Sequence, residues 1–92
     1  KANNLKSNDL YIIDSLGWAL FKLKRYEKAK DHLQTAVKLL PGDPIVNDHY
    51  GDVLWKVGKK VQARYYWNYV LNLEDTEEDL KDNIKNKLIL GL

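Results

Sequence analysis

The sequence contains no cysteine, and what it lacks excludes several classes of protein. Without cysteine the chain forms neither a disulfide framework nor a thiolate metal site. No apolar run approaches the ~18 residues that a membrane-spanning helix needs. The net charge of +2 is too small to indicate a nucleic-acid-binding protein by itself. What remains is one small domain of ordinary globular composition, and that composition does not indicate a cellular compartment.

Catalytic and cofactor motifs are also missing. His32 and His49 fall in different predicted helices, and no metal-ligand motif surrounds either of them. The serines and threonines have no neighbouring base, and no glycine-rich phosphate loop is present. We therefore expect a protein that is not an enzyme and that holds no metal and no cofactor. The two histidines are expected at the surface or in a seam between helices.

The chain repeats itself at an interval of 34 residues, which is the strongest signal in the sequence. Small residues recur on small ones and bulky apolar residues on bulky apolar ones. The matched pairs are Gly17 with Gly51, Leu20 with Leu54, Ala29 with Ala63, Leu33 with Trp67, and Ala36 with Val70. A fixed period in the range of 20 to 50 residues is typical of stacked-repeat proteins.

Helical spacing of apolar residues predicts two helical hairpins, at 10–23 with 26–40 and at 45–57 with 60–73, and a further helix from about 78. One predicted stripe consists of Ile12, Ile13, Leu16, Leu20 and Leu23. A glycine inside a helix costs about 1 kcal/mol relative to alanine. Its recurrence at Gly17 and Gly51 predicts close helix packing, with Ala29 and Ala63 opposite.

The identities resemble those of the tetratricopeptide repeat family. Leu16-Gly17, Leu20, Tyr26, Ala29, Leu33, Ala36 and Pro41 lie at the spacing of its pattern, and Tyr50-Gly51, Leu54, Gly58, Ala63, Trp67 and Val70 resemble it again. Both copies depart from it: Ile13 and Asn47 stand at its tryptophan position, and Asp75 stands where it has proline. The resemblance implies an all-α fold, an α-solenoid of two helix-turn-helix repeats plus a C-terminal capping helix.

We expect a single domain over 1–92, the C-terminal portion of a longer repeat array. Residues 1–9 are interpreted as the remnant of a preceding repeat, with a frayed terminus as the alternative, and residues 10–43 and 44–77 as the two repeats. Residues 78–92 are the expected capping helix, because Lys85 occupies the glycine position and forbids a further closely packed partner.

The first helices of stacked hairpins line a concave face that such proteins use for binding. We expect that face to be acidic in the middle and aromatic at one side, and to bind a protein or peptide that is basic or amphipathic. The candidate binding residues are Tyr11, Asp14, Trp18, Phe21, Ile45, Asp48, Asp52, Trp55 and Asp82.

Other interpretations stay open. One is that the face is a solvated surface and the chain a purely architectural end segment of a longer array. The basic hairpin-turn edge around Lys24 and Lys59 allows a weak contact with an anionic polymer or a membrane surface, although no nucleic-acid partner is expected. Finally, apolar residues Leu10, Ile12 and Ala19 on the N-terminal side predict self-association.

Overall fold

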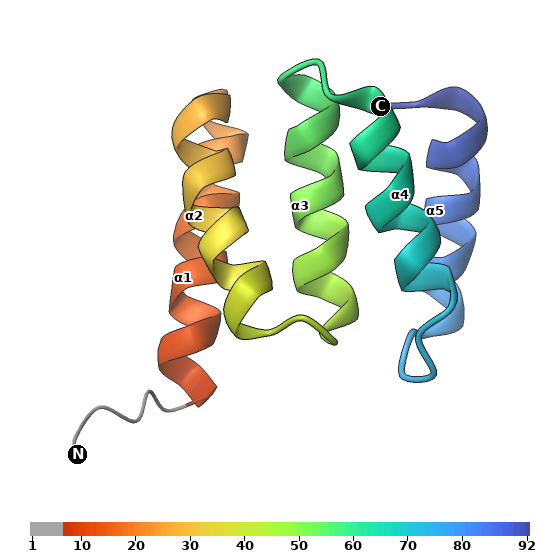
Figure 1. Cartoon of the computed structure of the whole chain (residues 1–92), viewed down its shortest axis with the longest axis horizontal. Helices are drawn as coiled ribbons and strands as arrows, with labels where there is room; N and C mark the ends of the chain where they lie inside the picture. The colour runs from red at the N-terminus through yellow and green to blue at the C-terminus, as the bar shows by residue number, and fades with distance from the viewer. Residues whose placement is uncertain (1–6) are drawn as a thin grey trace.

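The computed structural model describes residues 7–92, with side chains from residue 11 onward, and these residues form five helices and no strand (Figure 1). The predicted all-α fold is confirmed. Residues 1–6, interpreted as part of a preceding repeat, lie outside the described residues, as does the side chain of Leu10. The helices are α1 (Ser7–Lys22), α2 (Tyr26–Leu39), α3 (Pro44–Lys56), α4 (Lys60–Leu71) and α5 (Glu78–Leu90).

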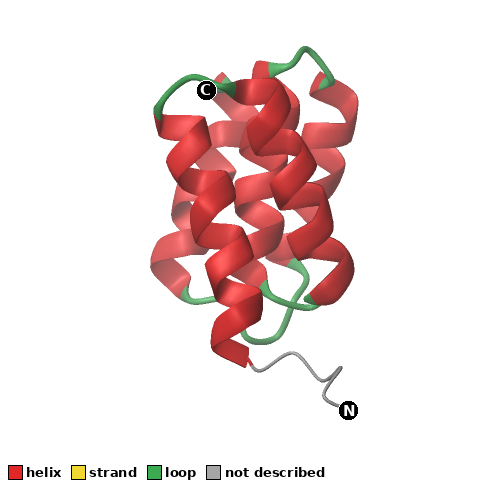
Figure 2. Cartoon of the chain, turned by 90° about the vertical axis from the view of Figure 1, so that its left-hand side faces the viewer, coloured by secondary structure: helices red, strands yellow, loops and turns green. Residues whose placement is uncertain are grey.

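Successive helices run antiparallel, so that α1 with α2 and α3 with α4 form two hairpins, and α5 packs against α4 (Figures 1 and 2). The connections gather at two ends of the bundle. We call one the turn end, with residues 23–25, 57–59 and 91–92. The other is the loop end, with residues 40–43 and 72–77. In the described part of the chain, no helix has the length and apolarity to cross a membrane.

The helix boundaries follow from local chemistry. Asp43 caps α3, accepting hydrogen bonds from the backbone N–H groups of Ile45 and Val46, and Pro44 occupies the first helical position. At the next loop the buried hydroxyl of Thr76 donates to the Val70 carbonyl at 2.6 Å, near the end of α4. The first helix is already formed at Ser7, the first described residue, ahead of the predicted start at residue 10.

Both mid-helix glycines lie at close helix contacts, as predicted, but the nearest atoms belong to Leu33 and Trp67 and not to the predicted alanines. A Cβ atom on Gly17 would lie 2.7 Å from Leu33 Cγ, and one on Gly51 would lie 2.6 Å from Trp67 Cδ1. Leu33 and Trp67 are themselves one repeat apart. The backbone carbonyl of Ala63 also lies opposite Gly51, where its oxygen would be 3.3 Å from the added Cβ atom. Absence of a side chain therefore lets a large core residue enter each hairpin.

The predicted apolar stripe of α1 is only partly buried. Ile13 and Leu20 pack against the core, whereas Ile12 and Leu16 are each 52% exposed and Leu23 is also exposed. The core consists of residues from α2 to α5, among them Leu33, Val53, Leu54, Trp67 and Ile84. The prediction that this whole stripe faces the core is therefore wrong, because no described helix covers the outer side of α1.

Candidate functional site

Asp48 and Asp52, predicted to give an open acidic centre to the binding face, are buried on α3. Lys87 of α5 reaches across to both, with its Nζ 2.8 Å from Asp48 Oδ1 and 2.9 Å from Asp52 Oδ1. The indole N–H of Trp67 donates to Asp52 Oδ1 at 3.1 Å. These carboxylates therefore join α5 to α3, and the expectation of an open acidic middle is wrong.

The carboxylates of Asp48 and Asp52 share the ammonium group of Lys87, and the pKa values of Asp52 and Lys87 are both raised. Burial, and then the neighbouring charge of Asp48, raise the pKa of Asp52 to about 6, against the opposing attraction of Lys87. Burial alone would lower the pKa of Lys87, but the charges of Asp48 and Asp52 outweigh it, so its pKa is raised. At neutral pH the lysine is therefore firmly charged, while Asp52 is close to its titration range.

Asp14 of α1, one repeat before Asp48, is also buried. Its hydrogen-bond partner is His49 on α3, the first helix of the next hairpin. His49 Nδ1 lies 3.0 Å from Asp14 Oδ1. Trp18 stacks on the ring of His49 with centroids 4.0 Å apart, and on Phe21 at 4.6 Å. His49 therefore lies in a seam between α1 and α3. Asp14 and Trp18 serve this junction instead of facing a groove.

Trp55, another predicted aromatic anchor, also packs mainly against other residues of the fold. Its ring stacks on Trp67 at a centroid distance of 5.4 Å and is covered by the side chains of Lys60 and Arg64. Gly91 approaches so closely that a Cβ atom there would overlap the Trp55 ring. Phe21 and Trp55 are thus half-buried packing residues, and neither stands free as an anchor.

The predicted residues that remain accessible lie towards the loop end, apart from Asp82 on α5. Tyr11 and Ile45, which are one repeat apart, both have exposed side chains, and the Tyr11 hydroxyl donates to Asp43 Oδ2. Beside Ile45 the α2–α3 and α4–α5 loops enclose a recess of about 340 Å³, which we call the loop-end recess. Its lining residues are Asp43, Pro44, Ile45, Asp75, Glu77, Asp79 and Leu80.

The loop-end recess combines apolar and acidic lining residues. Pro44, Ile45 and Leu80 supply the apolar part, and the four acidic residues come from both loops and the first turn of α5. Sequence reasoning missed this site because it followed helix faces and left out the loops. The periodic spacing of Tyr11, Ile45 and Asp79 at intervals of 34 is the signal that pointed towards it.

The described residues offer little for catalysis. No three of their histidine, aspartate and glutamate side chains are grouped so that they could hold a metal ion. His32 is exposed and bonds the backbone carbonyl of Lys28 in its own helix. The Nδ1 atom of His49 is hydrogen-bonded to Asp14.

Comparison with known proteins identifies one region of the chain. Residues 12–43, which include most of α1 and all of α2, match the family model of the tetratricopeptide repeat. No curated protein and no solved structure matches the chain. Repeats of this family generally mediate protein–protein interactions and are typically non-catalytic.

Proposed function

We propose, from the tetratricopeptide repeat that this chain contains, that it is a non-catalytic module that binds an extended basic or amphipathic peptide. The peptide contacts the first-helix face at its loop end, across Tyr11, Ile45 and the loop-end recess. This position replaces the centre of the face, where Asp14, Asp48 and Asp52 are already paired within the fold.

The chemistry of the loop-end recess is the observation that carries this proposal. Its carboxylates include the exposed Asp75, Glu77 and Asp79, and no lysine or arginine is among the lining residues of the recess. A lysine or arginine side chain has an aliphatic stem and a cationic head. The stem fits against Ile45 and Leu80, while the head reaches the surrounding carboxylates.

Along the same face the exposed ring of Tyr11 offers a second contact. An aromatic ring held in place by a hydrogen bond loses little conformational freedom on binding, and the Tyr11 hydroxyl is already held by Asp43. A peptide with a cation at one position and an apolar side chain farther along therefore contacts both places. The complementary charges favour basic partners over acidic ones.

Fluorescence anisotropy with two labelled peptides tests this proposal. One peptide alternates leucine with lysine, and the other alternates leucine with glutamate. We expect saturable binding of the lysine peptide alone. Asp75→Asn with Asp79→Asn weakens that binding about tenfold, as expected for loss of charge-assisted contacts. Equal binding of the two peptides would contradict the proposal.

A matched control comes from an acid elsewhere on the surface. Asp31 is exposed on α2 and is not part of the recess. Asp31→Asn also removes negative charge but leaves the recess intact, so binding of the lysine peptide should be unchanged. If it falls as it does in the recess variant, the attraction is a general charge effect and the recess is not the site.

The exposed side of α1 supports a second role, self-association. Ile12, Leu16 and Ala19 are exposed there, whereas the residues 34 positions later, Val46, Tyr50 and Val53, are buried on α3, which packs against the first hairpin through α2. The first set thus presents apolar side chains of the kind that stack one hairpin on another, and a second copy of the chain can cover them.

Sedimentation equilibrium tests this second role directly. Wild type should associate as its concentration rises, and Ile12→Asp with Leu16→Asp should remain monomeric because both charges would be buried in the contact. A monomeric wild type at high concentration would rule the contact out. Association with no binding of either peptide would instead favour the architectural role of an end segment in an array.

A further inference from the structure

The turn end of the molecule gathers positive charge at equivalent positions of both hairpins. Lys22 and Lys56 end the first helices, Arg25 and Lys59 precede the second helices, and Lys30 and Arg64 follow in the same register. Lys24, Lys28 and Lys60 add to them. The carboxylate of Glu27 lies 3.5 Å from Lys30 and offsets only part of this charge.

Apolar side chains project among these cations. The four most exposed large apolar side chains of the described residues are Val61 at 83%, Leu90 at 80%, Ile89 at 77% and Leu23 at 68%. All four lie in the first or last helical turn at this end, or directly beside it. Single exposed apolar residues are common on protein surfaces. Here, however, the four apolar side chains with the highest exposed fractions lie together at the basic end, and a need for solubility does not explain such a group.

Several of the cations occupy positions that disfavour them. Lys24 adopts a φ of 64°, in the left-handed region, while the residue one repeat later is Gly58 with a φ of 90°. The turn is therefore one for which glycine is suited, and lysine costs about 1 kcal/mol there. Arg25 and Lys59 occupy N-cap positions, where neither makes a side-chain capping hydrogen bond in the described structure.

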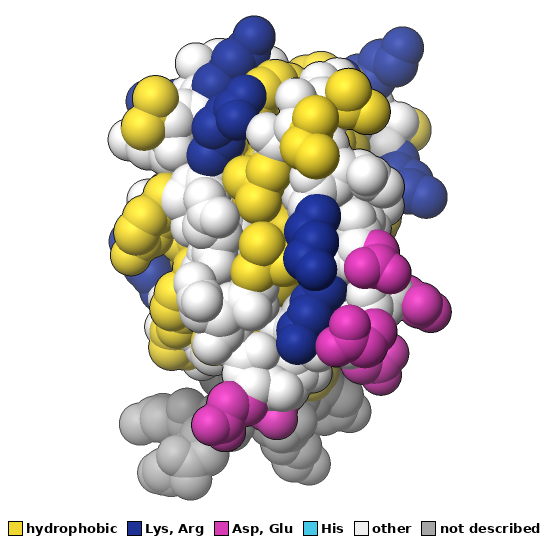
Figure 3. All heavy atoms as spheres, turned by 90° about the vertical axis from the view of Figure 1, so that its right-hand side faces the viewer, with side chains coloured by type: hydrophobic (Ala, Val, Ile, Leu, Met, Phe, Trp, Pro, Cys, Tyr) yellow, Lys and Arg dark blue, Asp and Glu magenta, His cyan; other side chains and the backbone are white. Residues whose placement is uncertain are grey.

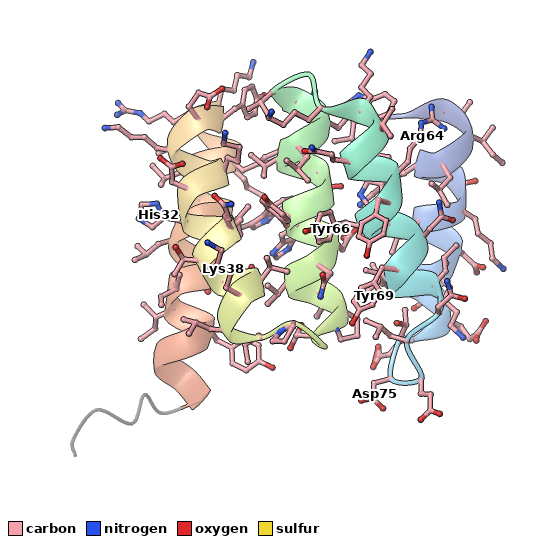
Figure 4. The ribbon with its side chains drawn as sticks, viewed as in Figure 1. His32, Lys38, Arg64, Tyr66, Tyr69 and Asp75 are labelled. Carbon is pink, nitrogen blue, oxygen red and sulfur yellow. The ribbon has the colours of Figure 1, made fainter. Side chains whose placement is uncertain are left out.

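Apart from Glu27, negative charge is concentrated away from the turn end. In Figure 3 the Asp and Glu side chains lie in the lower half of the face, and the upper end shows Lys, Arg and hydrophobic side chains. Figure 4 places Arg64 at the upper end and Asp75 at the lower one. Lys and Arg side chains also lie lower on the face in Figure 3, so its two ends differ in the Asp and Glu side chains, which its upper end lacks, and in the exposed apolar side chains gathered at the turn end.

We propose that the turn end binds the surface of an anionic lipid bilayer. The lysines and arginines lie against the lipid phosphates and carboxylates, and Leu23, Val61, Ile89 and Leu90 enter the interface between headgroups and acyl chains. Each cation near an anionic membrane contributes attraction, and each inserted aliphatic side chain adds apolar burial. A nucleic acid would satisfy the cations but would leave these aliphatic side chains without an apolar environment, which favours the bilayer.

Flotation with lipid vesicles tests the proposal on the chain itself. One set of vesicles contains phosphatidylcholine alone, and the other contains phosphatidylcholine with phosphatidylserine. We expect the protein to float with the anionic vesicles and to remain behind with the neutral ones. Binding should weaken as salt rises, because exposed charges are screened within about 8 Å at physiological ionic strength.

Two variants separate the apolar contribution from the charge. Leu23→Ser with Val61→Ser leaves every cation in place and should weaken binding to anionic vesicles about tenfold. The matched control is Ile45→Ser, because Ile45 is exposed at the loop end, and it should bind vesicles like wild type. Both side chains of the test variant are highly exposed, so circular dichroism should show an unchanged fold.

Lys24→Gly is the most specific test, because it should weaken vesicle binding without lowering the stability of the fold. Glycine accepts the left-handed turn without strain, so the midpoint of urea unfolding should not fall. Loss of one cation should weaken binding to anionic vesicles about fivefold. The exposed Lys38, near the end of α2 at the loop end, gives the control Lys38→Gln, which should leave vesicle binding unchanged.

Three results would overturn the proposal. The first is equal flotation with neutral and anionic vesicles, and the second is undiminished binding by the Leu23→Ser, Val61→Ser variant. The third is tight binding of a labelled RNA duplex that anionic vesicles fail to displace, which would assign the turn end to a nucleic acid.

Discussion

The outer side of α1 and the matching side of α3 carry the same kind of residues in different surroundings. Ile12 and Leu16 are each 52% exposed, whereas Val46 and Tyr50, one repeat later, are 0% and 7% exposed. The difference is that α2 packs against α3, and no described helix packs against the outer side of α1. The burial of a residue in a repeat protein is thus decided by the neighbouring repeat as much as by the residue itself.

The side-chain partners of the buried aspartates at the two junctions show a related difference. Where α1 meets α3, Asp14 is paired with a histidine, and where α3 meets α5, Asp48 and Asp52 are paired with a lysine. The same position, Asp14 in one repeat and Asp48 in the next, is thus bonded to different groups. Each junction sets its own electrostatics, although the backbone arrangement is repeated.

The largest expected effect comes from placing the same charge on the buried side of α3 and on the exposed outer side of α1. Val46→Asp places an unpaired charge in the core and should lower the free energy of unfolding by about 4 kcal/mol or more. Ile12→Asp, at the equivalent exposed position, should change it by less than about 1 kcal/mol. Urea denaturation followed by circular dichroism measures both. Equal losses would mean that the outer side of α1 is also buried in solution.

Removal of the lysine at the second junction should come next in size. Lys87→Met leaves Asp48 and Asp52 buried without a cation, which should lower the free energy of unfolding at pH 7 by about 3 kcal/mol. The control is Lys85→Met, since Lys85 is exposed on the same helix. A loss of stability similar to that of the control would show that water reaches the two carboxylates and hydrates them.

The raised pKa of Asp52 predicts how the same junction responds to pH. The folded-state pKa is about 6 and the ordinary pKa of an aspartate is 3.8, so between these values the folded chain keeps a proton that the unfolded chain has released. The contribution of Asp52 to stability is therefore lost as pH rises through this window, by up to about 3 kcal/mol.

Asp52→Asn isolates that contribution. Its free energy of unfolding should match that of wild type near pH 4 and exceed it at pH 7, since the amide oxygen still accepts the Trp67 N–H. Unfolding of both proteins across this pH range gives the difference. A difference that is constant with pH would show that Lys87 fully offsets the burial of the carboxylate.

The smallest expected effect compares the two glycine contacts. Gly51→Ala places a Cβ atom 2.6 Å from Trp67 Cδ1 and 3.3 Å from a backbone oxygen, whereas the Cβ atom in Gly17→Ala meets side chains alone. Overpacking outweighs the better helix propensity of alanine, so Gly51→Ala should lose about 1–2 kcal/mol and Gly17→Ala less. Thermal unfolding of both variants tests this order, and a larger loss for Gly17→Ala would reverse it.

The repeat period accounts for most of what the sequence could predict. The interval of 34 residues gave the helices, the two hairpins and the close contacts at Gly17 and Gly51. It could not give the partners of the buried acids, because Lys87 lies 39 and 35 residues from Asp48 and Asp52. Whether such a lysine reaches α3 depends on the position and rotation of α5, and a periodic pattern does not specify these.

The candidate site was predictable only in part, for a related physical reason. Tyr11 and Ile45 follow the repeat and are exposed as expected, but the loop-end recess needs two loops that are 32 residues apart in sequence, at Asp43 and Asp75. Asp14 and Asp52 were expected on an open binding face because they lie off the predicted core stripe of the first helices. Their burial depends on partners from other helices, His49 for Asp14 and Lys87 for Asp52.

The central position of α3 also has a consequence for motion. Val46, Val53 and Leu54 of this helix are almost completely buried, while α5 contributes the fully buried Ile84 and the tether of Lys87. Backbone amides exchange with deuterium through local opening, which is easiest where least apolar surface must be exposed. The amides of α5 should therefore exchange well before those of α3, so that the molecule opens from its C-terminal edge inward, one helix at a time.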